Sequence, residues 1–190
     1  MSTTTSWFGF NQVTDGFAGI WGSKSNSKVD NSSVAYDDLT TGSQSWFRHY
    51  WWGGTIPSSS TVDSIEVYVR GYITTSSTYD DTQSARFRVA FTWSGSTLLS
   101  SSTLPSSVPP YVNEGAAMEY TKSKSRSSWG LSNADALELC NGTSSTYPLC
   151  VGATNSSGDT ERFNIAYVKM RVTYTPPPGN VGMLVGNPGG

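Results

Sequence analysis

The sequence has little of what most catalytic, nucleic-acid-binding or membrane proteins need. Charged residues make up only 14% of its 190 residues, histidine occurs once and cysteine twice. The formal net charge is -2, which provides no basic field for phosphates, so we expect no nucleic-acid partner. No apolar run approaches the roughly 20 residues of a membrane span. The first residues also lack the basic-then-apolar order of a secretory signal, which predicts synthesis in the cytoplasm without insertion into a membrane.

Aromatic residues, in contrast, are plentiful. They form 13% of the chain, with seven Trp, ten Tyr and seven Phe. Low charge combined with many aromatics is typical of folded rather than disordered chains. A chain of this length suits one domain and can bury a sizeable core.

Alternating apolar residues are the main structural signal. Residues 56–73 place Ile65, Val67, Val69 and Ile73 on one face, and residues 163–175 repeat the pattern. A period of two predicts strands with one face in a core. Residues 85–93 alternate in the same way, and we expect them to pair with residues 56–73. The Ser- and Pro-rich stretch that follows is expected to hold a short edge strand at most.

Helix signals are few. We expect residues 135–139 to be extended, with a single capped turn at 132–139 as the one alternative. Short strands between Ser-, Gly- and Pro-rich loops predict an all-β, antiparallel β-sandwich, and both a jelly-roll and an immunoglobulin-like strand order satisfy the pattern. We divide the chain into an N-terminal segment (1–20), the sandwich (21–175) and an extended C-terminal arm (176–190), which begins with three prolines.

No motif for catalysis or metal binding accompanies these strands. The one histidine, His49, lies among aromatics in SWFRHYWW without a recognisable nucleophile or orienting carboxylate, so we expect it to pack. The acidic pairs at 37–38 and 80–81 are expected at solvated loop ends. We therefore predict no enzyme, no cofactor and no metal.

Function is instead expected in two groups of apolar side chains. Neighbours on a strand point to opposite faces, so the aromatics of SWFRHYWW cannot all enter one core. Exposed Trp and Tyr stack on sugars or fill protein interfaces. The apolar part of the arm offers a second contact. The candidate assembly or glycan contacts are Trp46, Tyr50, Trp51, Trp52, Met183, Leu184 and Val185.

Several segments together resemble a known family. KVDNSSVAY, IPSSSTVDSIEVYVRG, WGLSNADALEL and AYVKMRVTYTP are similar to segments of a β-sandwich domain found in bacteriophage virion structural proteins. The resemblance covers residues 21–175 and departs from the family pattern at Ser58–Ser60, where a glycine is common. It implies a virion component of the head-decoration, neck or tail type.

The only two cysteines, Cys140 and Cys150, bracket a loop that departs from this pattern. A disulfide there could contribute roughly 2 to 3 kcal/mol in the chain-entropy model. An extracellular particle would tolerate the bond, whereas a reducing cytoplasm favours two free thiols. Both alternatives stay open from sequence.

The functional expectation is a non-enzymatic structural protein of a bacteriophage virion. A capsid decoration or cement protein is favoured, because the chain is short and lacks fibrous repeats or heptads. The partners would be other virion proteins, first the major capsid protein, and further copies of the chain. The alternative is a carbohydrate-binding module or a receptor-binding tail or fibre protein that uses exposed Trp and Tyr on a glycan.

Overall fold

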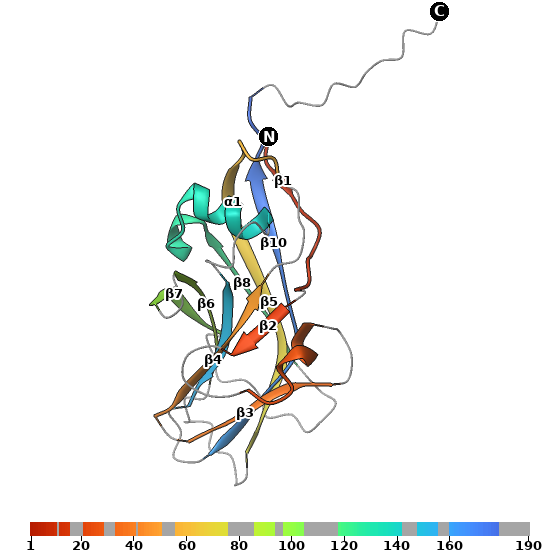
Figure 1. Cartoon of the computed structure of the whole chain (residues 1–190), viewed down its shortest axis with the longest axis vertical. Coiled ribbons are helices and arrows are strands. Elements are labelled where there is room, and N and C mark those ends of the chain that lie inside the picture. Colours follow the sequence, from red (N-terminus) through yellow and green to blue (C-terminus); the bar gives the residue numbers. More distant parts are fainter. Residues whose placement is uncertain are drawn as a thin grey trace, which may run out of the picture.

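The computed structural model describes residues 1–10, 12–15, 21–28, 33–40, 42–50, 56–75, 86–93, 97–104, 118–141, 148–155 and 160–178. They form two antiparallel sheets with one α-helix and two 3-10 turns. The elements are β1 (Thr3–Thr4), β2 (Gln12–Asp15), η1 (Lys24–Lys28), β3 (Ala35–Leu39), β4 (Gln44–Tyr50), β5 (Thr61–Thr75), β6 (Arg86–Trp93), β7 (Thr97–Leu104), β8 (Met118–Ser125), η2 (Ser127–Trp129), α1 (Asn133–Asn141), β9 (Leu149–Thr154) and β10 (Glu161–Thr175). The predicted all-β sandwich is confirmed (Figure 1).

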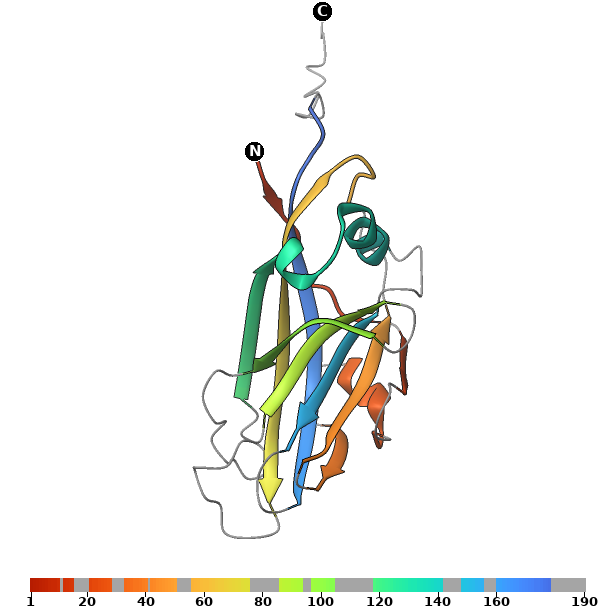
Figure 2. The same cartoon turned by 90° about the vertical axis from the view of Figure 1, so that its left-hand side faces the viewer.

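The strand order is that of a jelly roll. Sheet A has the order β1-β10-β5-β8, with β3 also on β10, and sheet B has the order β2-β4-β9-β6-β7. The strands β3 to β10 pair as a nested hairpin, in which β3 meets β10, β4 meets β9, β5 meets β8 and β6 meets β7. Folding this hairpin over itself gives the double-sheet jelly roll rather than the immunoglobulin arrangement. In Figure 2 the green strands β6 and β7 of sheet B pass in front of β5 and β10 of sheet A.

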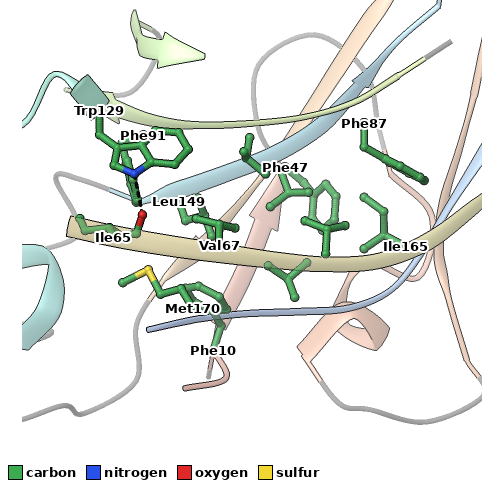
Figure 3. Packing of buried hydrophobic residues seen from close by; sticks show 14 of the residues in the cluster. Phe10, Phe47, Ile65, Val67, Phe87, Phe91, Trp129, Leu149, Ile165 and Met170 are labelled. Carbon is green, nitrogen blue, oxygen red and sulfur yellow. Dashed lines mark hydrogen bonds between the residues drawn. The ribbon is translucent and has the colours of Figure 1, made fainter. Parts of the chain in front are cut away.

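The core lies between the two sheets, where the alternating residues were expected. Ile65, Val67 and Val69 of β5 are fully buried in one cluster with Phe47 and Phe87 of sheet B. Figure 3 shows Ile65 and Val67 in this layer between the sheets. Strand β10 adds a matching row of buried residues, including Ile165, Val168, Met170 and Val172. The period-two pattern therefore identified the core face of both long strands.

The predicted pairing of residues 56–73 with residues 85–93 is wrong. Strand β5 pairs with β10 and β8, while β6 lies in the other sheet between β7 and β9. Alternation shows which side chains face a core, but it is the same for strands that pair and for strands that face each other across the sandwich. The stretch expected to hold a short edge strand at most does hold the edge strand β7 of sheet B, but β7 has eight residues and is as long as β6, with which it pairs.

Residues 135–139 are helical rather than extended. The Ser132 hydroxyl accepts a hydrogen bond from the Asp135 amide at 3.1 Å, and the Asp135 carboxylate accepts one from the Ser132 amide at 2.9 Å. This reciprocal pair caps the first turn of α1 in the manner of a capping box. The buried residues Ala136, Leu139 and Cys140 have the three- and four-residue spacing of one helix face.

Helix α1 also fixes the Pro- and Ser-rich turn that leads into β5. The side-chain amide of Asn141 bonds both backbone groups of Ile56, at 2.9 and 3.0 Å. Asn133 does the same for the backbone of Ser60 and Val62, at 2.9 and 2.8 Å. Two asparagines thus satisfy four backbone groups that no strand partner reaches. The helix lies at the end of the sandwich where the N-terminus is found (Figure 1).

Candidate binding surface

The outer face of sheet A carries a dense set of polar and aromatic side chains. Strand register places Ser123 of β8, Glu66 of β5 and Arg171 of β10 in one row across three strands. Arg171 and Glu66 form an ion pair in this row, with side-chain exposures of 40% and 21%. In the next row toward the middle of the sheet, Tyr68 lies opposite Lys169. The alternation that puts valines and isoleucines inside puts these side chains outside.

Three aromatic rings surround the ammonium group of Lys169. Its Nζ lies 4.2 Å from the ring centroid of Tyr68, 5.2 Å from that of Trp7 and 5.7 Å from that of Tyr167. The rings of Trp7 and Tyr68 also meet edge to face at 5.9 Å. The guanidinium of Arg171 lies 4.6 Å from the Trp7 ring on the side of the ion pair. Cation–π contacts of this kind contribute roughly 0.5 to 2 kcal/mol each, depending on exposure.

Trp7 reaches this face because the N-terminal segment runs along the edge of β10. The amide of Thr5 donates to the carbonyl of Val172 at 2.9 Å, and Phe8 and Met170 exchange both backbone hydrogen bonds at 2.8 and 3.0 Å. Because side chains alternate along an extended backbone, Trp7 points to the outer face, toward the charged row, and the residues next to it point away from that face. Segment 1–20 thus provides β1, β2 and two side chains of the surface, Thr4 and Trp7.

A polar hollow of about 270 Å³ lies at the Glu66–Arg171 row. Its lining side chains come from the N-terminal segment and from β5, β8 and β10: Thr4, Ser64, Glu66, Ser123, Arg171 and Thr173. The hollow exists because four of these six side chains are short hydroxyls, whereas the neighbouring row holds Lys169 and aromatic rings. Thr4 and Thr173 join their hydroxyls at 3.0 Å on one wall.

Trp46 is not a surface contact, contrary to the expectation from sequence. It is completely buried, in a small cluster with Ala90 and Cys150 on the side of sheet B away from the main core. The Arg88 guanidinium lies 5.3 Å from its ring. The indole lies over Gly152, where any Cβ would come within 2.9 Å of the ring. Alternation correctly places Trp46 and Phe47 on opposite faces of sheet B, but the face that carries Trp46 is covered as well.

The other predicted contacts have different outcomes. Tyr50 is half-buried at the end of β4, beside Gln12 of β2. Trp51, Trp52, Met183, Leu184 and Val185 lie outside the described residues. Their roles as assembly or glycan contacts stay predictions.

Cys140 and Cys150 are both buried and are not joined by a disulfide, so the disulfide alternative is wrong. Cys140 belongs to the main core, whereas Cys150 points to the opposite side of sheet B and packs with Trp46. A strand of the sheet therefore separates the two sulfur atoms. Burial raises the pKa of the Cys140 thiol to about 12, which keeps it protonated and unreactive.

A thiol assay tests this arrangement. In folded, unreduced protein we expect no rapid reaction of either cysteine with Ellman's reagent, because both side chains are buried and a thiolate is the reacting species. After denaturation without reductant, two thiols per chain should react. A Cys150→Ser variant should release one. Denatured protein that releases no thiol would show a disulfide and contradict the structure.

His49 lies in the core, which agrees with the expected packing role. Its ring contacts Phe10 and Phe47, with centroids 5.0 and 4.7 Å away, and its Nε2 lies 2.9 Å from the Ser27 hydroxyl. Ser27 donates its own proton to the Lys24 carbonyl at 2.7 Å, so it accepts from Nε2. A serine–histidine pair can serve catalysis, but here both side chains are fully buried.

The acidic pair at 37–38 lies on strand β3 rather than in a loop. Asp38 forms a two-pronged ion pair with Arg162 of β10, with both N–O distances at 2.7 Å. This hydrogen-bonded partner holds the pKa of Asp38 below its usual value. Partial burial is the main cause that raises the pKa of Asp37. The pair at 80–81 lies outside the described residues.

The sequence contained part of the signal for the outer face of sheet A. Alternation assigns Glu66, Tyr68, Lys169 and Arg171 to the outward face of their strands. It does not show that β5 and β10 are neighbours in the register that joins Glu66 to Arg171. Trp7 carried no periodic signal, because it lies in an irregular segment.

Comparison with known proteins finds no matching family model and no similar curated protein. Within the described ranges, no helix has the length and apolar character needed to cross a bilayer. In the same part of the chain, no three His, Cys, Asp or Glu side chains come together as metal ligands would.

Proposed function

We propose that the chain is a non-enzymatic structural protein of a bacteriophage particle, and that it decorates and stabilises the capsid surface. The observation that carries this proposal is the nested jelly-roll pairing of β3 to β10. Jelly rolls are used by viral capsid domains and by lectins, in which a rigid sandwich presents a surface to a partner. The segments that resemble phage structural proteins support the same role.

The edge strand β8 favours contact through surfaces and the arm rather than through an added strand. The edge strand β8 exposes Glu119, Thr121, Ser123 and Ser125 and also carries the half-buried Lys122 and Lys124. Lysines and polar residues on an edge oppose pairing with a further strand. Assembly by β-strand addition at β8 is therefore disfavoured.

The arm is the proposed attachment element. Thr175 is held at the end of β10 because its hydroxyl donates a hydrogen bond to the Asp63 carboxylate at 2.8 Å and lies within hydrogen-bonding distance of the Ser2 hydroxyl, at 3.1 Å. The chain continues from this anchored point through Pro176–Pro178, which cannot extend the ladder. An apolar segment that follows a fixed point can dock on a neighbouring capsid protein.

Binding to particles tests the proposal. Full-length protein, added to purified particles that lack it, should co-sediment at a saturating, fixed number of copies and raise the temperature at which the particles release their genome. A chain that ends at Thr175 should keep its own melting temperature and lose most of its occupancy. Unchanged occupancy of the shortened chain would contradict the role of the arm. Absence of any binding by the full chain would overturn the decoration role.

A further inference from the structure

We propose that the polar hollow on the outer face of sheet A binds one ring of a neutral sugar. The proposal concerns Thr4, Ser64, Glu66, Ser123, Arg171 and Thr173, with Trp7 beside them. None of these residues belongs to the arm or to the aromatic segment at 46–52. The proposal does not rest on the capsid role, because a sugar site can exist with or without attachment to a particle.

The polar groups of the hollow match the hydroxyls of a sugar. Glu66 offers carboxylate acceptors, Arg171 offers guanidinium donors, and four Ser and Thr hydroxyls can act as either. A pair of vicinal hydroxyls can bond to both a carboxylate and a guanidinium, whose geometries favour two-point contacts. Such convergent polar groups are typical of small-molecule sites.

The charge of the hollow selects a neutral ligand. Among the described residues that line it, the charged ones are Glu66 and Arg171, which neutralise each other as an ion pair. A phosphate or a sugar acid would have to compete with Glu66 for Arg171 and would face the repulsion of that carboxylate. A neutral ring with several hydroxyls meets no such cost.

The size of the hollow selects a single ring. At about 270 Å³ it lies just below the roughly 300 to 1,000 Å³ of pockets for drug-sized ligands. The opening toward solvent would leave the remaining units of a glycan chain outside. The occupant is therefore expected to be a terminal or branching unit rather than a long buried chain.

Trp7 lies beside the hollow, next to Arg171 of its lining, where a sugar held in the hollow can reach it. It is half-buried, and its ring centroid lies 5.2 Å from the Lys169 ammonium and 4.6 Å from the Arg171 guanidinium. A large, rigid ring with an apolar surface can pack on the C–H groups of a sugar. Because the ion pair and the cation–π contacts already fix these side chains, little conformational entropy is lost on binding.

The same chain provides a matched control. At the other end of β10, Arg162 pairs with Asp38 and lies 5.1 Å from the ring of Tyr36. This repeats the carboxylate, guanidinium and aromatic ring of the proposed site. However, Arg162 and Asp38 are more exposed, at 50% and 46%, and neither lines the hollow.

Saturation-transfer NMR on the full-length protein tests the proposal. The probes are glucose, galactose, mannose and N-acetylglucosamine as neutral sugars, with sialic acid and inorganic phosphate as charged ones. We expect at least one neutral sugar to bind and neither charged probe to bind. Glu66→Gln and Trp7→Ala should each weaken that binding at least tenfold, whereas Asp38→Asn should leave it unchanged.

A third variant, which blocks the hollow, tests the site even if Glu66→Gln or Trp7→Ala fails to fold. Ser123 is exposed on the edge strand β8, so Ser123→Tyr should fill the hollow without touching the core and abolish binding at an unchanged melting temperature. The proposal is overturned if no neutral sugar binds, if the blocked variant binds as well as the parent chain, or if phosphate is the preferred probe. A parent chain that binds particles but no neutral sugar would refute this site and leave the capsid role standing.

Discussion

Replacing Trp129 by alanine is expected to lower the free energy of unfolding by about 3 to 5 kcal/mol. Trp129 is fully buried at the end of the sandwich, where its ring meets Phe91 edge to face at 5.3 Å. Its Nε1 donates to the carbonyl of Ile65 at 2.9 Å, as the dashed line in Figure 3 shows. Truncation therefore removes a large apolar contact, opens a cavity and leaves a buried carbonyl without its donor.

Urea unfolding followed by circular dichroism measures this effect through the midpoint at constant m value. Trp129→Phe is the control, because it keeps most of the ring and removes only the hydrogen bond and part of the volume. We expect it to cost about 1 to 3 kcal/mol, clearly less than alanine. A loss below about 1 kcal/mol for Trp129→Ala would be incompatible with a fully buried residue at this position.

The turn that carries Trp129 explains why the sequence did not single it out. The residue follows a polar run, KSKSRSS, with no apolar periodicity. Its burial depends on η2, which is followed by Gly130 in the left-handed region with φ of 78°. Arg126 ties this turn to β5 and to Leu131 through bonds to backbone carbonyls at 3.1 and 2.8 Å. The burial of Trp129 therefore depends on tertiary contacts, which a local sequence pattern does not show.

The sequence predicted which residues of each strand face the core, but not which strands pair. The inward positions of β5 and β10 follow directly from period two, as does the separation of Trp46 from Phe47. Pairing partners are not contained in that pattern, because the nested jelly-roll order brings β3 to β10 across more than a hundred residues. For this reason the pairing of β5 with β6 predicted from sequence is wrong, and the choice between a jelly-roll and an immunoglobulin-like strand order stayed open.

The candidate surface was predicted in part for a related reason. The sequence can show that the side chains of Glu66 and Arg171 lie on the outer face, but their ion pair depends on strand register. Conversely, aromatic density suggested that Trp46 is exposed, whereas a cluster on the second face of sheet B buries it. Residue type predicts what a side chain can do, and only the packing shows whether a ligand can reach it.

The single histidine is expected to make the protein sensitive to acid. Burial, opposed by a backbone hydrogen bond with Leu149, lowers the pKa of His49 from 6.5 to about 3. The unfolded chain therefore takes up a proton near pH 6.5, while the folded chain does not until about pH 3. This difference costs nothing above pH 6.5 and destabilises the fold increasingly as the pH falls from 6.5 to 3, by about 1.4 kcal/mol per pH unit.

Two measurements check this linkage. Because the chain has one histidine, its imidazole gives a single set of NMR signals, and these should not titrate between pH 8 and pH 4.5. Between pH 7 and pH 4.5, the free energy of unfolding should fall by about 2.5 kcal/mol more in the parent protein than in a His49→Gln variant. Gln can still bond to Ser27 and does not titrate, so effects of Asp37 and other carboxyls cancel in the comparison. An imidazole that titrates near pH 6.5 in the folded protein, or equal pH slopes for the two proteins, would mean that His49 is open to water rather than enclosed by Phe10 and Phe47.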